Sequence, residues 1–194
     1  MEAANLGAYL ADRSDADRDA AVDALADAPP YAEDRAGYIG AEVEIRERFA
    51  PGGESLAIPT WVSAGEPISQ FASHIAKYFS NSIREDGLLA VATAGIVFAP
   101  GGAGTMQEIF QDAAQNADRI FGRSPMTFLD TRHYCLETGL YPALERQATR
   151  LGFTDLLSVS DEPEQILDRF PVVATRPSLE GTPDMLVRRM RNAR

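Results

Sequence analysis

The sequence predicts an α/β protein with a Rossmann-like open parallel sheet and helices on both faces. Short apolar stretches alternate with helical ones four times between residues 56 and 170, as in open parallel sheets. Within residues 95–111, a strand runs through a glycine-rich turn into a helix. The chain has 194 residues, of which 45% are hydrophobic, and this is enough for one globular domain with a substantial core.

Three helices are expected before the first strand. The Ala-rich residues 2–11, the acidic stretch 12–27 and residues 35–49 all have helical patterns. The two glycines at 51–53 have no strand before them and no helix after them. We therefore interpret this Pro-Gly-Gly segment as an ordinary loop rather than a phosphate loop.

Strands and helices alternate in the rest of the chain. Residues 56–62 are predicted as a strand interrupted by Pro59. A long helix is predicted from Ile68 to Ile83, because its apolar residues recur every three or four positions. The further expected strands are 96–98, 126–129 and 156–159, and the further expected helices are 106–119, 140–150 and 163–170.

Residues 95–111 are the most informative stretch. Residues 96–98 are β-branched or aromatic, as in a strand buried on both faces of a parallel sheet. Pro100 is expected to end this strand, because proline has no N–H to donate to a neighbouring strand. The strand therefore leads directly into the glycine-rich turn.

The turn itself predicts an anion site. Gly101, Gly102 and Gly104 can adopt positive φ and let another group approach the backbone closely. Thr105 is a suitable N-cap for a helix that begins at Met106. Free N–H groups and the positive end of the helix dipole would converge at this point, where they favour a bound anion.

Three nucleotide-binding interpretations of this turn compete. The P-loop of NTPases needs a Lys after its glycines, and the only Lys of the chain is Lys77. The dinucleotide motif Gly-x-Gly-x-x-Gly has Gln107 in place of its third glycine, although Asp130 could imitate the ribose-binding acid. The third interpretation is a cradle for one phosphate, with Glu108 one helical turn beyond Thr105. These two residues also have the spacing of a capping box, in which the Glu only caps its helix.

Composition excludes several classes of partner. The net charge of −11 argues against sequence-independent binding of duplex nucleic acid, which requires many Lys and Arg residues. Cys135 is the only cysteine, so no disulfide framework is expected and a reducing cytoplasm fits. His74 and His133 are the only histidines, and they leave little material for a metal site. No apolar run approaches 18 residues, so no membrane partner is expected.

Residues 100–108, Pro-Gly-Gly-Ala-Gly-Thr-Met-Gln-Glu, resemble position by position the Pro-Gly-Gly-x-Gly-Thr-x-x-Glu signature of the LOG family. This family comprises the cytokinin riboside 5′-monophosphate phosphoribohydrolases, once described as lysine decarboxylases. Its members also have an Arg-Lys pair on the preceding helix, where Arg84 is here followed by Glu85. The resemblance covers roughly residues 57–168.

The resemblance implies hydrolysis of the N-glycosidic bond of a nucleoside 5′-monophosphate such as AMP, giving free base and ribose 5-phosphate. It also implies a homodimer that needs no cofactor. Glu108 would stabilise the positive charge that develops at C1′, and Arg84 would pair with the phosphate or the developing charge. The residues that would hold the 5′-phosphate are Gly101, Gly102, Gly104 and Thr105.

A function of a different class remains open. In a non-catalytic nucleotide-binding or carrier module of the same fold, Glu108 would only cap its helix. Lysine decarboxylation is disfavoured, because it needs an electron sink such as PLP and Lys77 has no loop context for a Schiff base. His133 and Cys135 are not interpreted as a nucleophile pair, since near neighbours in sequence rarely face each other productively.

Residues 1–8 resemble the sequence that follows a first glycine-rich turn in longer members of the family. On this resemblance the chain begins inside the family domain, through a misassigned start or a truncated gene, and lacks the first strands of the sheet. The expected organisation is a single domain over 1–175, with a helical insertion at 12–51, and a tail at 176–194. Such a chain is expected to be poorly stable alone or to depend on a partner.

Overall fold

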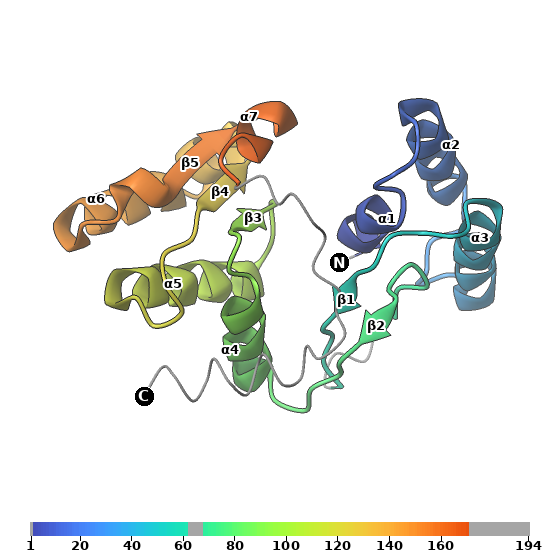
Figure 1. Ribbon diagram of the computed structural model, residues 1–194, viewed down its shortest axis with the longest axis horizontal. Helices are drawn as coiled ribbons and strands as arrows, with labels where there is room; N and C mark the ends of the chain where they lie inside the picture. The colour runs from blue at the N-terminus through green and yellow to red at the C-terminus, as the bar shows by residue number, and fades with distance from the viewer. Residues whose placement is uncertain (1, 62–67, 171–194) are drawn as a thin grey trace. The chain divides into compact units, whose positions relative to one another are not determined.

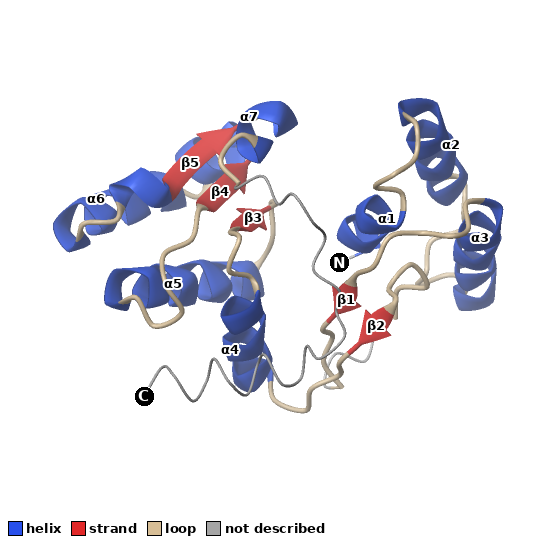
Figure 2. Cartoon of the chain, in the orientation of Figure 1, coloured by secondary structure: helices blue, strands red, loops and turns tan. Residues whose placement is uncertain are grey.

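A computed structural model describes residues 2–61 and 68–170 of the chain (Figure 1). These residues divide into two compact units, one that ends at Arg84 and one that begins at Glu85. Both units combine helices with parallel strands, which confirms the mixed α/β class (Figure 2). A single domain over 1–175 stays a prediction. The predicted turn at 63–67 and the tail at 176–194 lie outside the described residues.

The first unit contains the three helices predicted before the first strand. Ser14 and Asp34 cap the second and third of them, because each side chain accepts a hydrogen bond from the backbone N–H three residues further on. A buried apolar cluster joins all three helices to Phe71. The elements are α1 (Glu2–Tyr9), α2 (Asp15–Ala26), α3 (Arg35–Arg48), β1 (Leu56–Ala57) and β2 (His74–Ile75).

The predicted helix from Ile68 to Ile83 is wrong, because this segment pairs with β1 as a parallel strand. Alternate backbone N–H groups donate to alternate carbonyls of the earlier segment: His74 to Ser55, Ala76 to Ala57 and Tyr78 to Pro59. A helix begins only at Asn81. Apolar residues spaced three and four apart fit a helix, but they did not exclude a strand in this segment. The strand is formed by hydrogen bonds to a partner some 18 residues earlier, which a local pattern does not reveal.

The strand predicted at 56–62 is confirmed over Leu56–Ala57. Pairing continues beyond Pro59, because the Trp61 N–H donates to the Tyr78 carbonyl and Thr60 bridges Tyr78 in parallel. Proline is tolerated there since its carbonyl still accepts a hydrogen bond although it has no N–H to donate.

The second unit has a three-stranded parallel sheet in the order β3-β4-β5, so its three predicted strands are confirmed. Within the described residues the strands form this sheet and the separate β1-β2 pair, and one continuous Rossmann-like sheet stays a prediction. Helix α4 (Asn81–Val91) begins in the first unit and continues into the second. The elements after it are β3 (Ile96–Phe98), α5 (Ala103–Asp118), β4 (Met126–Leu129), the π-helix η1 (Arg132–Glu137), α6 (Leu140–Leu151), the 3₁₀ turn η2 (Thr154–Leu156), β5 (Leu157–Ser160) and α7 (Pro163–Leu167).

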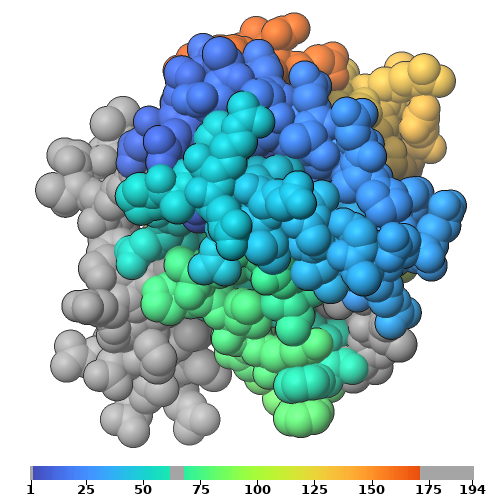
Figure 3. All heavy atoms as spheres, turned by 90° about the vertical axis from the view of Figure 1, so that its right-hand side faces the viewer, coloured from blue at the N-terminus to red at the C-terminus, as the bar shows by residue number. Residues whose placement is uncertain are grey.

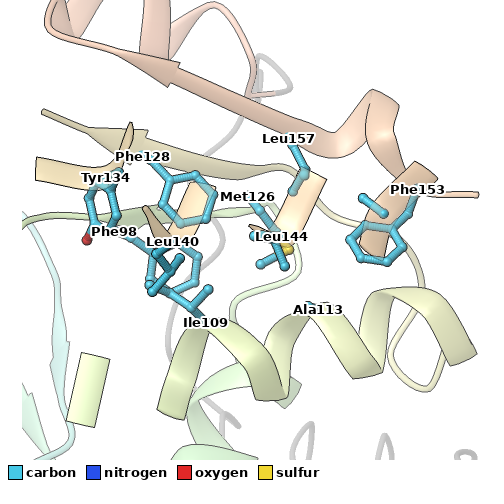
Figure 4. Packing of buried hydrophobic residues seen from close by; sticks show 11 residues of the cluster. Phe98, Ile109, Ala113, Met126, Phe128, Tyr134, Leu140, Leu144, Phe153 and Leu157 are labelled. Atoms are coloured by element: carbon cyan, nitrogen blue, oxygen red, sulfur yellow. The ribbon is translucent and has the colours of Figure 1, made fainter. Parts of the chain in front are cut away.

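The core of the second unit fixes both ends of the glycine turn. Ile109 and Ala113 of α5 pack in one buried cluster with Phe98 of β3 and Met126 of β4 (Figure 4). Leu144 of α6 completes this cluster from the next helix. Because β3 enters the turn and α5 leaves it, the buried apolar contacts on both sides position the turn between them.

Candidate functional site

The glycine turn lies at the carboxyl end of β3, where ligands bind in open parallel sheets. Residues 99–104 are exposed. Gly102 is the N-cap of α5, with φ −92° and ψ −153°, and no side chain in the described part of the chain makes a capping hydrogen bond there. The first turn of a 16-residue helix is therefore open to solvent, with the positive end of its dipole at the turn.

Helix α5 begins at Ala103, three residues before the predicted start at Met106. Thr105 is therefore not the N-cap but lies inside the first turn, and the predicted capping box with Glu108 is wrong. Glu108 lies in the second turn of α5 and is half-buried. Helix capping thus does not explain the presence of a carboxylate at this position.

Only one glycine of the turn is required by its surroundings, and for a different reason than predicted. The glycines with positive φ among the described residues are Gly95, Gly122, Gly139 and Gly152, so the turn does not use this property. A Cβ on Gly101 would collide with the Thr105 side chain, whose own Cβ would be 2.9 Å away. Apart from the adjacent residues and the backbone of α5 itself, no atom lies within 4 Å of the corresponding position on Gly102 or Gly104. Gly101 thus permits close packing of Thr105, and the other two leave open space.

The π-helix η1, which follows β4, is hydrogen-bonded to the residue that leads into the glycine turn. The hydroxyl of the buried Tyr134 donates to the Ala99 carbonyl at 2.6 Å, directly before Pro100. Burial, together with the charge of Asp130, raises the pKa of Tyr134 to about 12, so this hydroxyl stays protonated and can donate. Tyr134 was not predicted as a site residue, because no local pattern connects it with a carbonyl 35 positions earlier.

Asp130 begins the segment that carries Tyr134. Its φ is 88°, an uncommon conformation for a residue with a side chain, and a π-helix follows it. Its carboxylate accepts a hydrogen bond from the His133 N–H at 2.8 Å. The acid that could have imitated a ribose-binding carboxylate therefore supports the local backbone at the end of β4.

Helices α4 and α5 are connected by two side-chain hydrogen bonds. Gln107 donates to the completely buried Glu85, and Gln111 donates to the exposed Asp86. Glu85 stands where the family resemblance places a Lys, and it binds a residue of the motif itself. Arg84 belongs to the first compact unit, and its position relative to Glu108 stays a prediction.

One turn beyond Glu108, Asp112 is a buried carboxyl group that sequence reasoning missed. Its Oδ1 accepts a hydrogen bond from Asn116 Nδ2 at 3.1 Å, while its Oδ2 is buried without a hydrogen-bond partner among the described residues. Burial raises the pKa of Asp112 to about 7. A cavity of about 10 Å³ lies beside it, also lined by Ser124 and Gln115. Such a cavity is about large enough for one water molecule.

The environment of Cys135 does not activate its thiol. Burial, followed by the charges of Glu145 and Asp161, raises the pKa of Cys135. The neighbouring His133 instead lies with its Nδ1 3.6 Å from Glu137 Oε2. This geometry offers no thiolate nucleophile.

Among residues 2–61 and 68–170, no group of three or more His, Cys, Asp or Glu side chains could hold a metal ion. In the same part of the chain, every helix is too short or too polar to cross a membrane.

No protein-family model and no curated protein matches this sequence. The resemblance to the LOG family therefore depends on the residues of the glycine motif and on their surroundings. What the described residues establish is an α/β protein with an open, glycine-rich helix start at the carboxyl end of a parallel strand.

Proposed function

We propose that this protein is a cytoplasmic phosphoribohydrolase with a Rossmann-like fold, which cleaves the N-glycosidic bond of a nucleoside 5′-monophosphate such as AMP and acts as a homodimer. The observation that carries the proposal is the exposed, uncapped start of α5 with Glu108 one turn further along the same helix. The first feature suits a phosphate and the second suits a reacting sugar.

The phosphate would be bound by the backbone. The N–H groups of the first turn of α5 and the Thr105 hydroxyl are the available donors, and the helix dipole adds positive potential. Gly102 and Gly104 leave open space where the phosphate oxygens would approach. This local arrangement is needed because the whole chain carries a net charge of −11.

Glu108 would act on the sugar. As the C1′–N bond breaks, positive charge develops at C1′, and a fixed carboxylate stabilises this charge and orients the attacking water. Water adds its oxygen to C1′ and the base leaves with a proton, giving ribose 5-phosphate. Arg84 is proposed to pair with the phosphate or with the developing charge. The reaction requires no cofactor.

A non-catalytic nucleotide-binding or carrier module is the second candidate. It is favoured by Glu85, an acidic residue in place of the Lys of the resembled pair, which makes a structural hydrogen bond to Gln107. In this case the turn would bind a nucleotide without cleaving it.

Incubation with AMP and other monophosphates, followed by chromatography of the free base, distinguishes the two candidates. We expect base release by the unmodified chain and its loss in Glu108→Gln with nucleotide binding retained. Glu145→Gln changes an exposed carboxylate on α6 and should release base normally. Nucleotide binding without any base release by the folded, unmodified protein would favour the binding module instead.

A further inference from the structure

Glu42 is a completely buried acidic residue in the middle of α3, in the first unit. Ile45, three positions further along the same face of the helix, belongs to the buried apolar cluster of this unit. Figure 3 shows the opposite face of α3, light blue to cyan, at the molecular surface. An acidic side chain rarely lies on the buried face of a helix, because removing its charge from water is costly unless a partner compensates for it.

The side chain that meets Glu42 is another acid, Glu2 in the first turn of α1. The two carboxyl groups are in hydrogen-bond contact with each other. Both carboxyl oxygens of Glu42 and Oε1 of Glu2 are buried, and no donor of the described residues is in hydrogen-bond geometry with them. Two ionised carboxylates are acceptors only, so this contact requires a proton on one of them. Glu2 and Glu42 therefore share one proton, and we call them the acid pair.

The surroundings of the acid pair favour a proton over a cation. Burial, followed by the hydrogen bond and the charge of Glu2, raises the pKa of Glu42 to about 8, and the nearby Gln70 backbone partly offsets this rise. Tyr38, one turn earlier on α3, has its own pKa raised by burial and by the charges of both acids. In the described part of the chain, no Lys, Arg or His contributes to the pKa of Glu42. The same residues offer no third His, Cys, Asp or Glu with which the pair could hold a metal ion.

The other end of α1 is held by neutral contacts. Leu6 and Tyr9 pack in the apolar cluster of the first unit. The Tyr9 hydroxyl donates to the Arg46 carbonyl at 2.6 Å, and the Gly53 N–H donates to the Tyr9 carbonyl at 2.9 Å. The acid pair lies instead at the start of α1. Loss of the shared proton would therefore act on the first turn of this helix.

We propose that the acid pair is a pH-dependent contact, which holds the start of α1 on α3 while it keeps its proton and releases it when both carboxyl groups are ionised. Loss of the proton to water leaves two adjacent buried negative charges, which repel each other. In the released state Glu42 regains its ordinary pKa of 4.5, whereas in the attached state this pKa is raised to about 8. The contribution of the pair is therefore complete below about pH 4.5 and is lost by about pH 8.

Hydrogen exchange of the α1 amides in the full chain measures this release, once each rate is corrected for the intrinsic effect of pH. We expect the protection of α1 to fall by up to about tenfold per pH unit between pH 5 and pH 8, because release is linked to the loss of one proton. In Glu42→Gln the protection should stay nearly constant, since the amide donates as the protonated carboxyl group does. An equal fall in Glu42→Gln and the unmodified protein would overturn the proposal.

Glu44→Gln is the matched control, because it removes an exposed carboxylate from the same helix. It should show the same fall in protection as the unmodified protein. The ¹³C signal of the Glu42 carboxyl group gives a second measurement, which needs no substitution at this position. We expect it to titrate near pH 8, and at lower pH in Glu2→Gln, where an amide can donate to the ionised Glu42. Titration of Glu42 near its ordinary value in the unmodified protein would also overturn the proposal.

Discussion

Gln107, within the glycine motif, donates its side-chain N–H to the carboxylate of Glu85, which has no solvent exposure. This hydrogen bond connects the start of α5 to α4, and it provides the buried Glu85 carboxylate with a hydrogen-bond donor. A parallel bond connects the same two helices from Gln111 to Asp86, but there the acceptor is exposed. The two pairs differ mainly in burial.

Gln107→Met should therefore destabilise the protein more than Gln111→Met. The first substitution removes a donor from a buried carboxylate and should cost about 2 kcal/mol, whereas the second leaves an acceptor that water can reach and should cost less than about 0.5 kcal/mol. Urea unfolding measures both. Equal losses of stability in the two variants would show that burial of Glu85 does not matter.

Gly101→Ala and Gly104→Ala should change stability in opposite directions. The added methyl group collides with Thr105 at position 101, which forces the turn or this side chain to move and should cost about 1–3 kcal/mol. At position 104 the methyl group meets no atom and replaces glycine inside a helix, so it should be neutral or stabilise by up to about 1 kcal/mol. Thermal unfolding of the two variants tests this contrast. A destabilising Gly104→Ala would contradict the open space seen there.

Tyr134→Phe should weaken substrate binding without unfolding the protein. It removes only the hydroxyl that holds the Ala99 carbonyl before the glycine turn, a loss of about 1 kcal/mol. If the turn binds phosphate as proposed, KM for AMP should rise about fivefold with a smaller change in kcat. Tyr141→Phe is the control, because its ring packs on the same Phe128. The same KM in both variants would argue against a positioning role.

Asp112 should make stability fall as the pH rises. Its pKa is raised from 3.8 to about 7 in the folded protein, so the folded state holds a proton that the unfolded state has lost between these values. The contribution is fully present below about pH 4 and is lost by about pH 7, and the total is at most about 4 kcal/mol.

Asp112→Asn should therefore be more stable than the unmodified protein at pH 8, with a smaller difference at pH 5. Chemical denaturation at the two pH values measures this effect. The control is Asp118→Asn, which removes an exposed carboxylate at the end of the same helix. A pH dependence that is identical in the Asp112→Asn variant and the unmodified protein would refute this assignment.

Local patterns were sufficient for much of the fold. Helices α1 to α3 and strands β3 to β5 were predicted because Ala-rich or acidic helical stretches and short apolar runs are local patterns that span only a few residues. The glycine turn between β3 and α5 was predicted for the same reason. Its residue types, and the Glu108 that follows them, can be recognised without any knowledge of distant contacts.

Tertiary structure decided what depended on distant partners. The segment after Ile68 is a strand because its N–H groups meet carbonyls of 55–59, whereas its own apolar spacing also fitted a helix. The Tyr134 bond to Ala99 and the burial of Asp112 likewise depend on residues or surfaces that sequence neighbours do not reveal. The sequence by itself determined the residue types and the strand-turn-helix order of the glycine turn, and only packing determined where α5 begins and which side chains support that turn.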